Sequence, residues 1–115
     1  MSELNVQGMS IAQNVVETIV TLAVRDVEGV AGLYAPATSG IRSLIGGKSS
    51  TQPIQIDTDE NDELHIVLRL EVKSGYVLPD VAANVRQAAA DAVAIQVGAK
   101  VGSVDIYIDG IQFSK

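Results

Sequence analysis

Histidine is the side chain that most often performs acid–base chemistry near neutral pH, and the chain contains one, His65. It falls in the stretch LHIVLRLEVKS, where apolar and polar residues alternate as they do in a half-buried strand. In that pattern His65 points outward with Val67 and Arg69, and no second histidine or cysteine supports a metal site around it. No positioned acid, base or nucleophile accompanies it. The sequence therefore predicts no catalytic residue, no metal and no cofactor, and we expect the protein not to be an enzyme.

Two other stretches resemble binding loops but lack the residues that define them. The acidic segment from Asp57 to Glu63 could begin a twelve-residue calcium loop. Such a loop needs glycine at its sixth position and glutamate at its twelfth, and counting from Asp57 the chain has Asp62 and Leu68 there. The stretch GGKSS would end a phosphate-binding loop only if that loop also began with glycine, where the chain has Arg42. We expect the first segment to be a solvated acidic turn and the second a solvated loop.

Composition limits the classes of partner. A chain of 115 residues is the length of one domain with one core, so residues 1–115 are expected to form a single domain. Eight basic residues against fourteen acidic ones give a net charge of −6, which disfavours binding to nucleic acid or anionic lipid head groups. No apolar run is long enough to span a membrane, and the first residues, MSELNVQG, lack signal-peptide character. We expect a cytoplasmic protein that does not insert directly into a membrane.

Two segments have the apolar spacing of amphipathic helices, residues 11–27 and residues 79–97. Ser10 and Gln13 have the spacing of a capping box at the start of the first helix, and residues 1–9 before it are expected to form a loose or short extended arm. The predicted apolar rows in the first helix are Val15, Ile19, Ala23 and Val27 with Val16, Val20 and Val24. In the second helix they are Val81, Val85, Ala88, Ala92 and Ile95, flanked by Ala82, Ala89, Val93 and Val97.

Short alternating segments between and after these helices predict strands. VAGLY follows the first helix, Ile54 and Ile56 begin a hairpin that returns over residues 64–73, and SVDIYID follows the second helix. The element order is therefore α-β-β-β-α-β. We predict an α+β domain with both helices packed on one face of a small mixed or antiparallel sheet.

If both helices cover one face of the sheet, the other face of the two long strands is open to water. This face would be either a solvated surface or a surface for docking and self-assembly, since tyrosine and arginine suit interfaces. The residues predicted to form it are His65, Val67, Arg69, Glu71, Lys73, Asp105, Tyr107 and Asp109.

A second candidate for partner binding lies in the long connection over residues 35–53, which is rich in Gly, Ser, Thr and Pro. Loops of this length are uncommon in compact domains and are often functional. Within it Ile41, Leu44 and Ile45 have the spacing of one apolar helical turn. This turn would either cover the edge of the core or stand exposed as an anchor for a partner.

Two parts of the chain resemble the alkaline shock protein family, envelope stress response proteins of Gram-positive bacteria. The first is GMSIAQNVVETIVTLAVRDVEGVAGLY, with its isoleucine-led helix and its Val-x-Gly-Val-x-x-Leu exit at residues 27–33. The second, more specific part joins Gly75-Tyr76, the Val-rich helix, and the ending from Val101 to Phe113. Together they cover residues 8–113. The chain departs from the family in its Ser-Gly-Tyr entry and in lacking an extended charged tail.

The resemblance implies a non-enzymatic protein linked to envelope or alkaline stress, on the cytoplasmic side of the membrane. Since the chain has no membrane span of its own, a membrane-anchored partner or self-assembly into a homo-oligomer would hold it there. The function expected on this basis is that of a protein–protein interaction or scaffolding module. The rival class is a small-ligand-binding regulatory domain, with a pocket between the long loop and the second helix.

Overall fold

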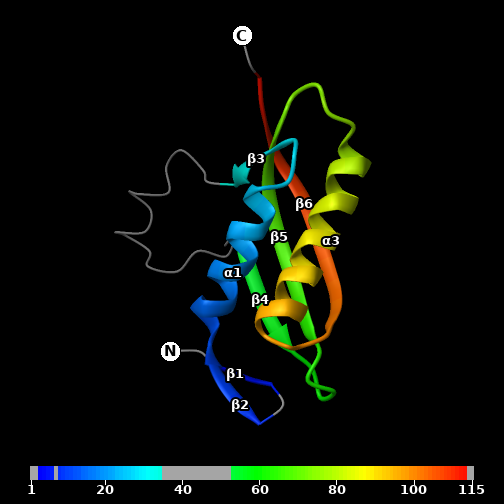
Figure 1. Ribbon diagram of the computed structural model, residues 1–115. Helices are drawn as coiled ribbons and strands as arrows, with labels where there is room; N and C mark the ends of the chain where they lie inside the picture. The colour runs from blue at the N-terminus through cyan, green and yellow to red at the C-terminus, as the bar shows by residue number, and fades with distance from the viewer. Residues whose placement is uncertain (1–2, 7, 35–52, 114–115) are drawn as a thin grey trace, which may run out of the picture.

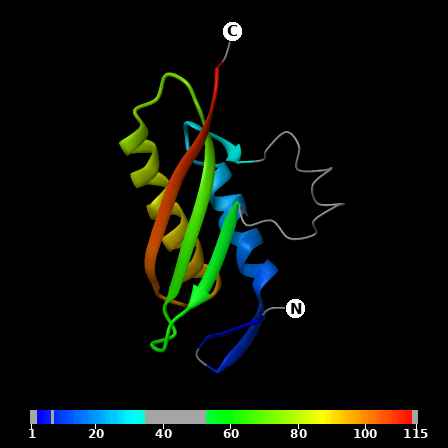
Figure 2. The same cartoon turned by 180° about the vertical axis from the view of Figure 1, so that it is seen from behind.

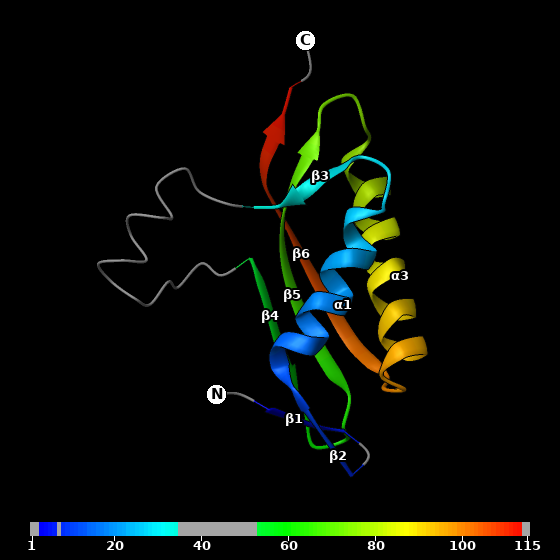
Figure 3. The same ribbon diagram turned by 60° about the vertical axis from the view of Figure 1, so that its left-hand side comes forward.

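The computed structural model describes residues 3–6, 8–34 and 53–113, in which a pair of helices packs on a four-stranded sheet. Helices α1 (Gln13–Arg25) and α3 (Leu78–Gln96) both lie on one face of that sheet (Figure 1, Figure 3). The strands of the sheet are β3 (Val30–Leu33), β4 (Ile54–Thr58), β5 (Leu64–Lys73) and β6 (Val101–Gln112). The predicted α+β class is confirmed. In the described part of the chain, neither helix combines the length and apolarity needed to cross a membrane.

Strand β5 is the centre of the sheet, and its two edges are used differently. Strand β6 pairs with one edge, parallel to β5, whereas β3 and β4 share the other edge end to end, both antiparallel to β5. These two strands meet at Arg69. The Arg69 carbonyl accepts a bond from the Tyr34 N–H, and the Arg69 N–H donates to the Pro53 carbonyl, each at 2.8 Å. The sheet is therefore mixed, and its strand order is one that the sequence pattern left open.

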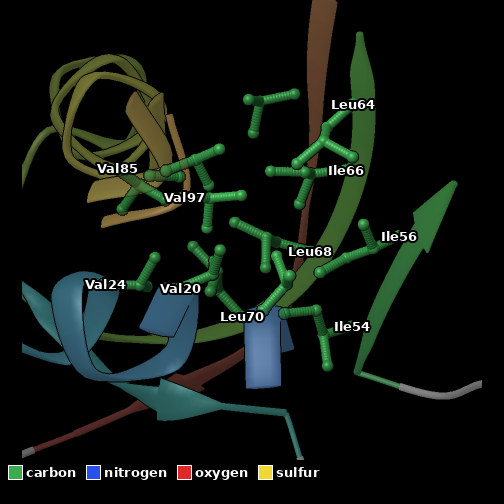
Figure 4. Close-up of a cluster of buried hydrophobic side chains, with 14 of the residues drawn as sticks. Val20, Val24, Ile54, Ile56, Leu64, Ile66, Leu68, Leu70, Val85 and Val97 are labelled. Atoms are coloured by element: carbon green, nitrogen blue, oxygen red, sulfur yellow. The ribbon is translucent and has the colours of Figure 1, made fainter. Parts of the chain in front are cut away.

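The core lies between the sheet and the helices. The inward residues of β5 alternate with outward ones, which pins the register of the strand, because a slip of one residue would expose the whole row. Figure 4 shows four residues of this row, Leu64, Ile66, Leu68 and Leu70, pointing toward Val20 and Val24 of α1 and Val85 of α3. Fully burying one such side chain contributes ~1.5–3 kcal/mol. The row is completely buried and consists of Leu64, Ile66, Leu68, Leu70 and Val72.

The N-terminal segment is extended, as one of the two expected forms of this arm, but it is paired and partly buried instead of standing free. Residues Glu3–Val6 (β1) and Met9–Ala12 (β2) pair as an antiparallel hairpin, and Leu4 and Val6 are buried against the core. The driving force is the burial of these two apolar side chains, whose alternation with Glu3 and Asn5 had the period of a strand.

The predicted capping box is also wrong, because Ser10 belongs to the N-terminal hairpin. Ser10 lies in β2, and its hydroxyl donates to Glu3 Oε1 at 2.8 Å. Helix α1 begins after Ala12 and has no side-chain cap. Gln13 instead donates through Nε2 to the carbonyl of Ile56 at 3.1 Å, which ties the start of α1 to β4. Strand pairing has therefore replaced the local cap.

Both helices bury a narrower stripe than the one predicted. In α1 the buried residues are Val16, Val20 and Val24, while Val15 is 47% exposed. In α3 the buried row is Val81, Val85, Ala89 and Val93, and Ile95 is 79% exposed. Each helix has the other helix on one side and the sheet below it. A helix in this position buries about one third of its circumference, so the apolar residues at the margins of the stripe remain in water.

Candidate functional site

The face of the sheet opposite the helices carries the residues that the sequence singled out. Figure 2 views the molecule from this side, with the strands in front of both helices, and no described helix lies over them. We call it the open face. His65, Val67, Arg69 and Glu71 of β5 are half-buried on it, and Lys73 at the end of that strand is exposed. Asp105, Tyr107 and Asp109 of β6 are exposed beside them.

Arg69 is the centre of this face. It lies opposite Tyr107 in the parallel register of β5 and β6, and its guanidinium carbon is 4.5 Å from the centroid of the Tyr107 ring. Its Nη1 also donates to Asp109 Oδ2 at 2.9 Å. About one quarter of each of the two ion-paired side chains is exposed, so the pair is partly screened by water. The Nε atom of Arg69 is buried and has no hydrogen-bond partner among the described residues.

A β-bulge in β6 aims Asp109 at Arg69. Leu70 pairs with Ile108 and Glu71 with Gly110, so Asp109 is the extra residue between two ladder positions. Bulges of this kind redirect a side chain and shift the alternation that follows. As a result Gly110 falls on the open face, and Ile111, which is still 45% exposed, falls on the helix side opposite buried Val72.

Tyr34 belongs to the same group, although the sequence pattern did not single it out. A Cβ atom added at Gly110 would lie 3.2 Å from Glu71 Oε2 and 3.4 Å from Tyr34 Cδ1, so Glu71 leans from β5 toward β6 and Tyr34 reaches across β5 to the same glycine. Two tyrosines thus flank one arginine on the open face. We refer to Tyr34, Arg69, Glu71, Tyr107 and Asp109 as the Arg69 cluster.

A second polar group lies at the other end of the open face. The His65 ring bonds through Nδ1 with Ser103 Oγ at 2.8 Å and through Nε2 with Asp59 Oδ2 at 2.7 Å. Asp59 Oδ1 accepts the backbone N–H groups of Asn61 and Glu63 at 2.8 and 3.1 Å. Serine hydrolases use the same residue types, but there the serine bonds Nε2 and the carboxylate bonds Nδ1, the reverse of this arrangement. We assign the group a structural role, tying the β4–β5 turn to β5 and β6.

These bonds make Asp59 sensitive to acid. The hydrogen bond from His65 is the largest cause that lowers the pKa of Asp59 below its usual 3.8, and the backbone N–H of Glu63 lowers it further. A carboxyl with a depressed pKa stabilises the fold above its ordinary pKa, and this stabilisation is lost as the pH falls through the folded-state value.

We therefore expect Asp59→Asn to lose less stability than the wild type when the pH is lowered from about 5 to about 2. Urea unfolding at several pH values measures this difference. Glu60→Gln, a change at an exposed residue of the same turn, is the matched control and should keep the wild-type dependence. If Asp59→Asn kept that dependence as well, the carboxyl would not carry this contribution.

The predicted site residues thus fall into separate groups. The structure brings Arg69, Tyr107 and Asp109 together, with Glu71 beside them, and places His65 in the second group. Val67 lies between the two groups, paired with Gln55 and Asp105 in the register of the sheet. The predicted apolar turn at Ile41, Leu44 and Ile45 lies outside the described residues.

A cavity of about 280 Å³ opens on the helix side, where the loop after β5 joins α3. It is lined by Glu28, Gly75, Tyr76, Val77, Asp80, Val81 and Asn84. The ring of Tyr76 packs over Gly29, so the cavity sits against the turn between α1 and β3. Its lining combines one aromatic ring with two carboxylates and an amide.

Comparison with known proteins gives three likenesses. The sequence matches the alkaline shock protein 23 family, which is described as having a cell envelope-related function, over residues 2–113. It is 27% identical over 105 residues to an uncharacterized protein of Bacillus subtilis (strain 168), YqhY, covering 91% of this chain and 77% of that protein. A solved histidine-to-alanine variant of MamM-CTD superposes with a TM-score of 0.49 and 13% identity, over 90% of this chain and 99% of that one.

Proposed function

The chain belongs to the alkaline shock protein 23 family, and from this premise we propose that it is a non-enzymatic envelope stress protein that acts by binding other proteins. In this proposal it is a scaffolding module at the cytoplasmic side of the membrane, and the Arg69 cluster is its docking site. The observation that carries the proposal is the gathering of Tyr34, Arg69 and Tyr107 on the face that the helices leave open.

The chemistry of the Arg69 cluster suits a protein partner. Tyrosine and arginine are enriched among the few residues that dominate the binding energy of interfaces. Asp109 and Tyr107 hold the guanidinium in place, so little side-chain freedom remains to be lost on binding. The partner would place an apolar group on the tyrosines and an acceptor, such as a backbone carbonyl or a carboxylate, near Arg69.

Charge argues for a protein rather than a lipid surface as the immediate contact. The chain has eight basic residues against fourteen acidic ones, and on the open face Glu71, Asp105 and Asp109 accompany the cations. Anionic head groups attract clusters of Lys and Arg, and the described residues of this face form no such cluster. We propose that a membrane-anchored protein recruits the chain to the membrane.

The proposal predicts that Arg69→Ala and Tyr107→Ala abolish both capture of the membrane protein and sedimentation of the chain with membranes. Truncating a dominant interface residue costs ~2 kcal/mol or more, which is roughly a thirtyfold loss of affinity. Tagged variants are compared by affinity capture and by membrane fractionation. The change Arg25→Ala, at an exposed residue at the end of α1, is the matched control and should behave as the wild type. Equal capture by all variants would rule out the open face as the docking site.

A second candidate function, a small-ligand-binding regulatory domain, is favoured by the cavity beside Tyr76. Its aromatic ring, with Glu28 and Asp80 nearby, suits a small cationic or hydrogen-bonding metabolite. Thermal stabilisation by such a compound, abolished in Asp80→Asn and unchanged in Arg69→Ala, would support this candidate. The absence of a shift across a library of amines would count against it.

A further inference from the structure

Strand β6 is the longest strand of the sheet and lies at its edge. It has 12 residues, and among the described strands only β5 pairs with it. Its outer edge therefore presents N–H and C=O groups that no described strand satisfies. Arg86 of α3 donates through Nε to the Val104 carbonyl at 3.3 Å, but a carbonyl oxygen can accept a second bond. A long edge of this kind is a template for another strand.

Two bulges limit the part of β6 that can pair regularly. The first lies at Gly102, between the positions opposite Leu64 and His65, and the second lies at Asp109. The regular stretch is therefore residues 103–108. Within it Val104, Ile106 and Ile108 are on the helix side, while Asp105 and Tyr107 are on the open face.

The charges on this stretch select one way in which two copies of β6 can pair. In a two-fold antiparallel pair, residues opposite each other share a face of the sheet. If the two-fold axis passes between the two copies of Asp105, their side chains lie opposite each other. If it passes between the two copies of Tyr107, Asp105 lies opposite Asp109 of the second copy. Both arrangements are penalised by like-charge repulsion. An axis at Val104 has only Ser103 before the bulge at Gly102, and an axis at Ile108 lies directly beside the bulge at Asp109.

An axis at Ile106 avoids these conflicts and creates favourable pairs. Ile106 then lies opposite itself, and buried Val104 lies opposite half-buried Ile108 of the second copy, so β-branched residues meet on the helix side. On the open face Asp105 lies opposite Tyr107 of the second copy. The guanidinium of Arg69 of the second copy lies over that tyrosine ring, so Asp105 has a cation nearby.

The helix layer fits the same axis. The bond from Arg86 to Val104 marks the side of α3 that faces the β6 edge, and Ala82 and Ala90, one turn before and after it, lie on that side. Helix α3 runs antiparallel to β6 (Figure 1). Ile106 is two residues beyond Val104, ~7 Å along the strand, which corresponds to about four residues back along the helix. The axis therefore passes close to Ala82.

We propose that the chain forms a two-fold dimer through antiparallel pairing of β6 about Ile106, with the α3 helices of the two copies in contact at Ala82. The small side chain there permits the 8–10 Å approach of packed helices. The two Arg86 side chains are kept about two helical turns apart. This inference goes beyond the proposed function, because it concerns main-chain pairing of two copies at the sheet edge and not the docking of a partner on the Arg69 cluster. The two open faces would join into one continuous surface.

Light scattering across a concentration series tests the dimer. We expect the mass of the wild type to rise from monomer to dimer with concentration, and Ala82→Glu to remain a monomer, since two carboxylates would meet on the axis. Ala94→Glu, the same change at an exposed position of α3, should dimerise as the wild type does. Circular dichroism confirms that both variants fold. A wild type that stays monomeric into the millimolar range, or equal dissociation by both variants, would overturn the proposal.

Cysteine pairing tests the axis directly, because the chain contains no cysteine. Opposed residues in an antiparallel pair have Cα atoms about 4.5–5.5 Å apart, within reach of a disulfide. Asp105→Cys mixed with Tyr107→Cys should give a covalent heterodimer under mild oxidation, whereas each variant alone should not. Rapid linkage of either variant alone would point to a different axis, and no linkage in a chain that is dimeric by mass would exclude the β6 edge. Because Ala82 lies on the helix side, loss of the dimer in Ala82→Glu leaves the capture test of the Arg69 cluster separately interpretable.

Discussion

Leu68→Ala is expected to lower the free energy of unfolding by about 2–5 kcal/mol. Leu68 is the middle residue of the inward row on the central strand, and its side chain is completely buried between the sheet and both helices. Removing three carbons there forfeits their transfer free energy and leaves a cavity that β5, with strands on both edges, cannot collapse. Since a domain of this size has roughly 5–15 kcal/mol of stability, the change removes a large part of it.

Urea-induced unfolding followed by circular dichroism measures this loss. Leu22→Ala, at a leucine of α1 that is 60% exposed, is the matched control and should change stability by less than about 0.5 kcal/mol. A loss at Leu68 no larger than the loss at Leu22 would mean that the sheet and the helices do not share one close-packed core.

Gly29→Ala is expected to be the second most damaging single change. Gly29 is buried in the turn from α1 to β3 with φ at +95°, and its carbonyl accepts the N–H of Lys73 at 2.8 Å. An added Cβ would lie 2.9 Å from Val81 Cγ2 and 3.1 Å from the Tyr76 ring. Backbone strain costs ~1–3 kcal/mol, and forcing the packed neighbours apart costs ~1–3 kcal/mol more.

Gly75→Ala separates these two contributions. Gly75 has φ at +96°, almost the same as Gly29, but a Cβ added there meets nothing within 4 Å. This control should show the backbone strain alone, so the difference between the two variants in thermal or urea unfolding reports the clash with Val81 and Tyr76. Equal losses would show that α3 can move away from the turn at no cost.

The sequence pattern was most informative where burial repeats over many residues. Five alternating apolar residues in β5 fixed both the strand and its inward face, because no other register hides them all. Burial of both helices against one face followed from their apolar stripes. The N-terminal hairpin escaped prediction because Leu4 and Val6 give only two alternations, too few to distinguish a strand from an arm.

The candidate site was only partly accessible to the same reasoning. Alternation placed Arg69 and Tyr107 on one face, but their direct opposition depends on the register of a parallel pair, which side-chain pattern alone does not determine. Tyr34, the residue after β3, joins them from the other edge of β5, and Asp109 reaches Arg69 through a bulge. The bonds of His65 to Asp59 and Ser103 likewise join residues from a turn and from a strand distant in sequence. Contacts of this type arise from tertiary structure, and no local spacing encodes them.

The meeting of β3 and β4 at a single residue has a consequence for how freely the chain can vary. Tyr34 and Pro53 bond to the two main-chain groups of the same residue, Arg69, so these two positions, far apart in the sequence, meet at one point of the sheet. Lengthening a connection between these two positions raises the entropic cost of closing it by only ~0.6 kcal/mol for each doubling of its length. This connection is therefore a natural place to shorten the chain, to insert a foreign domain or to make new chain ends by permutation. The hydrogen bonds of β3 and β4 with β5 would remain intact.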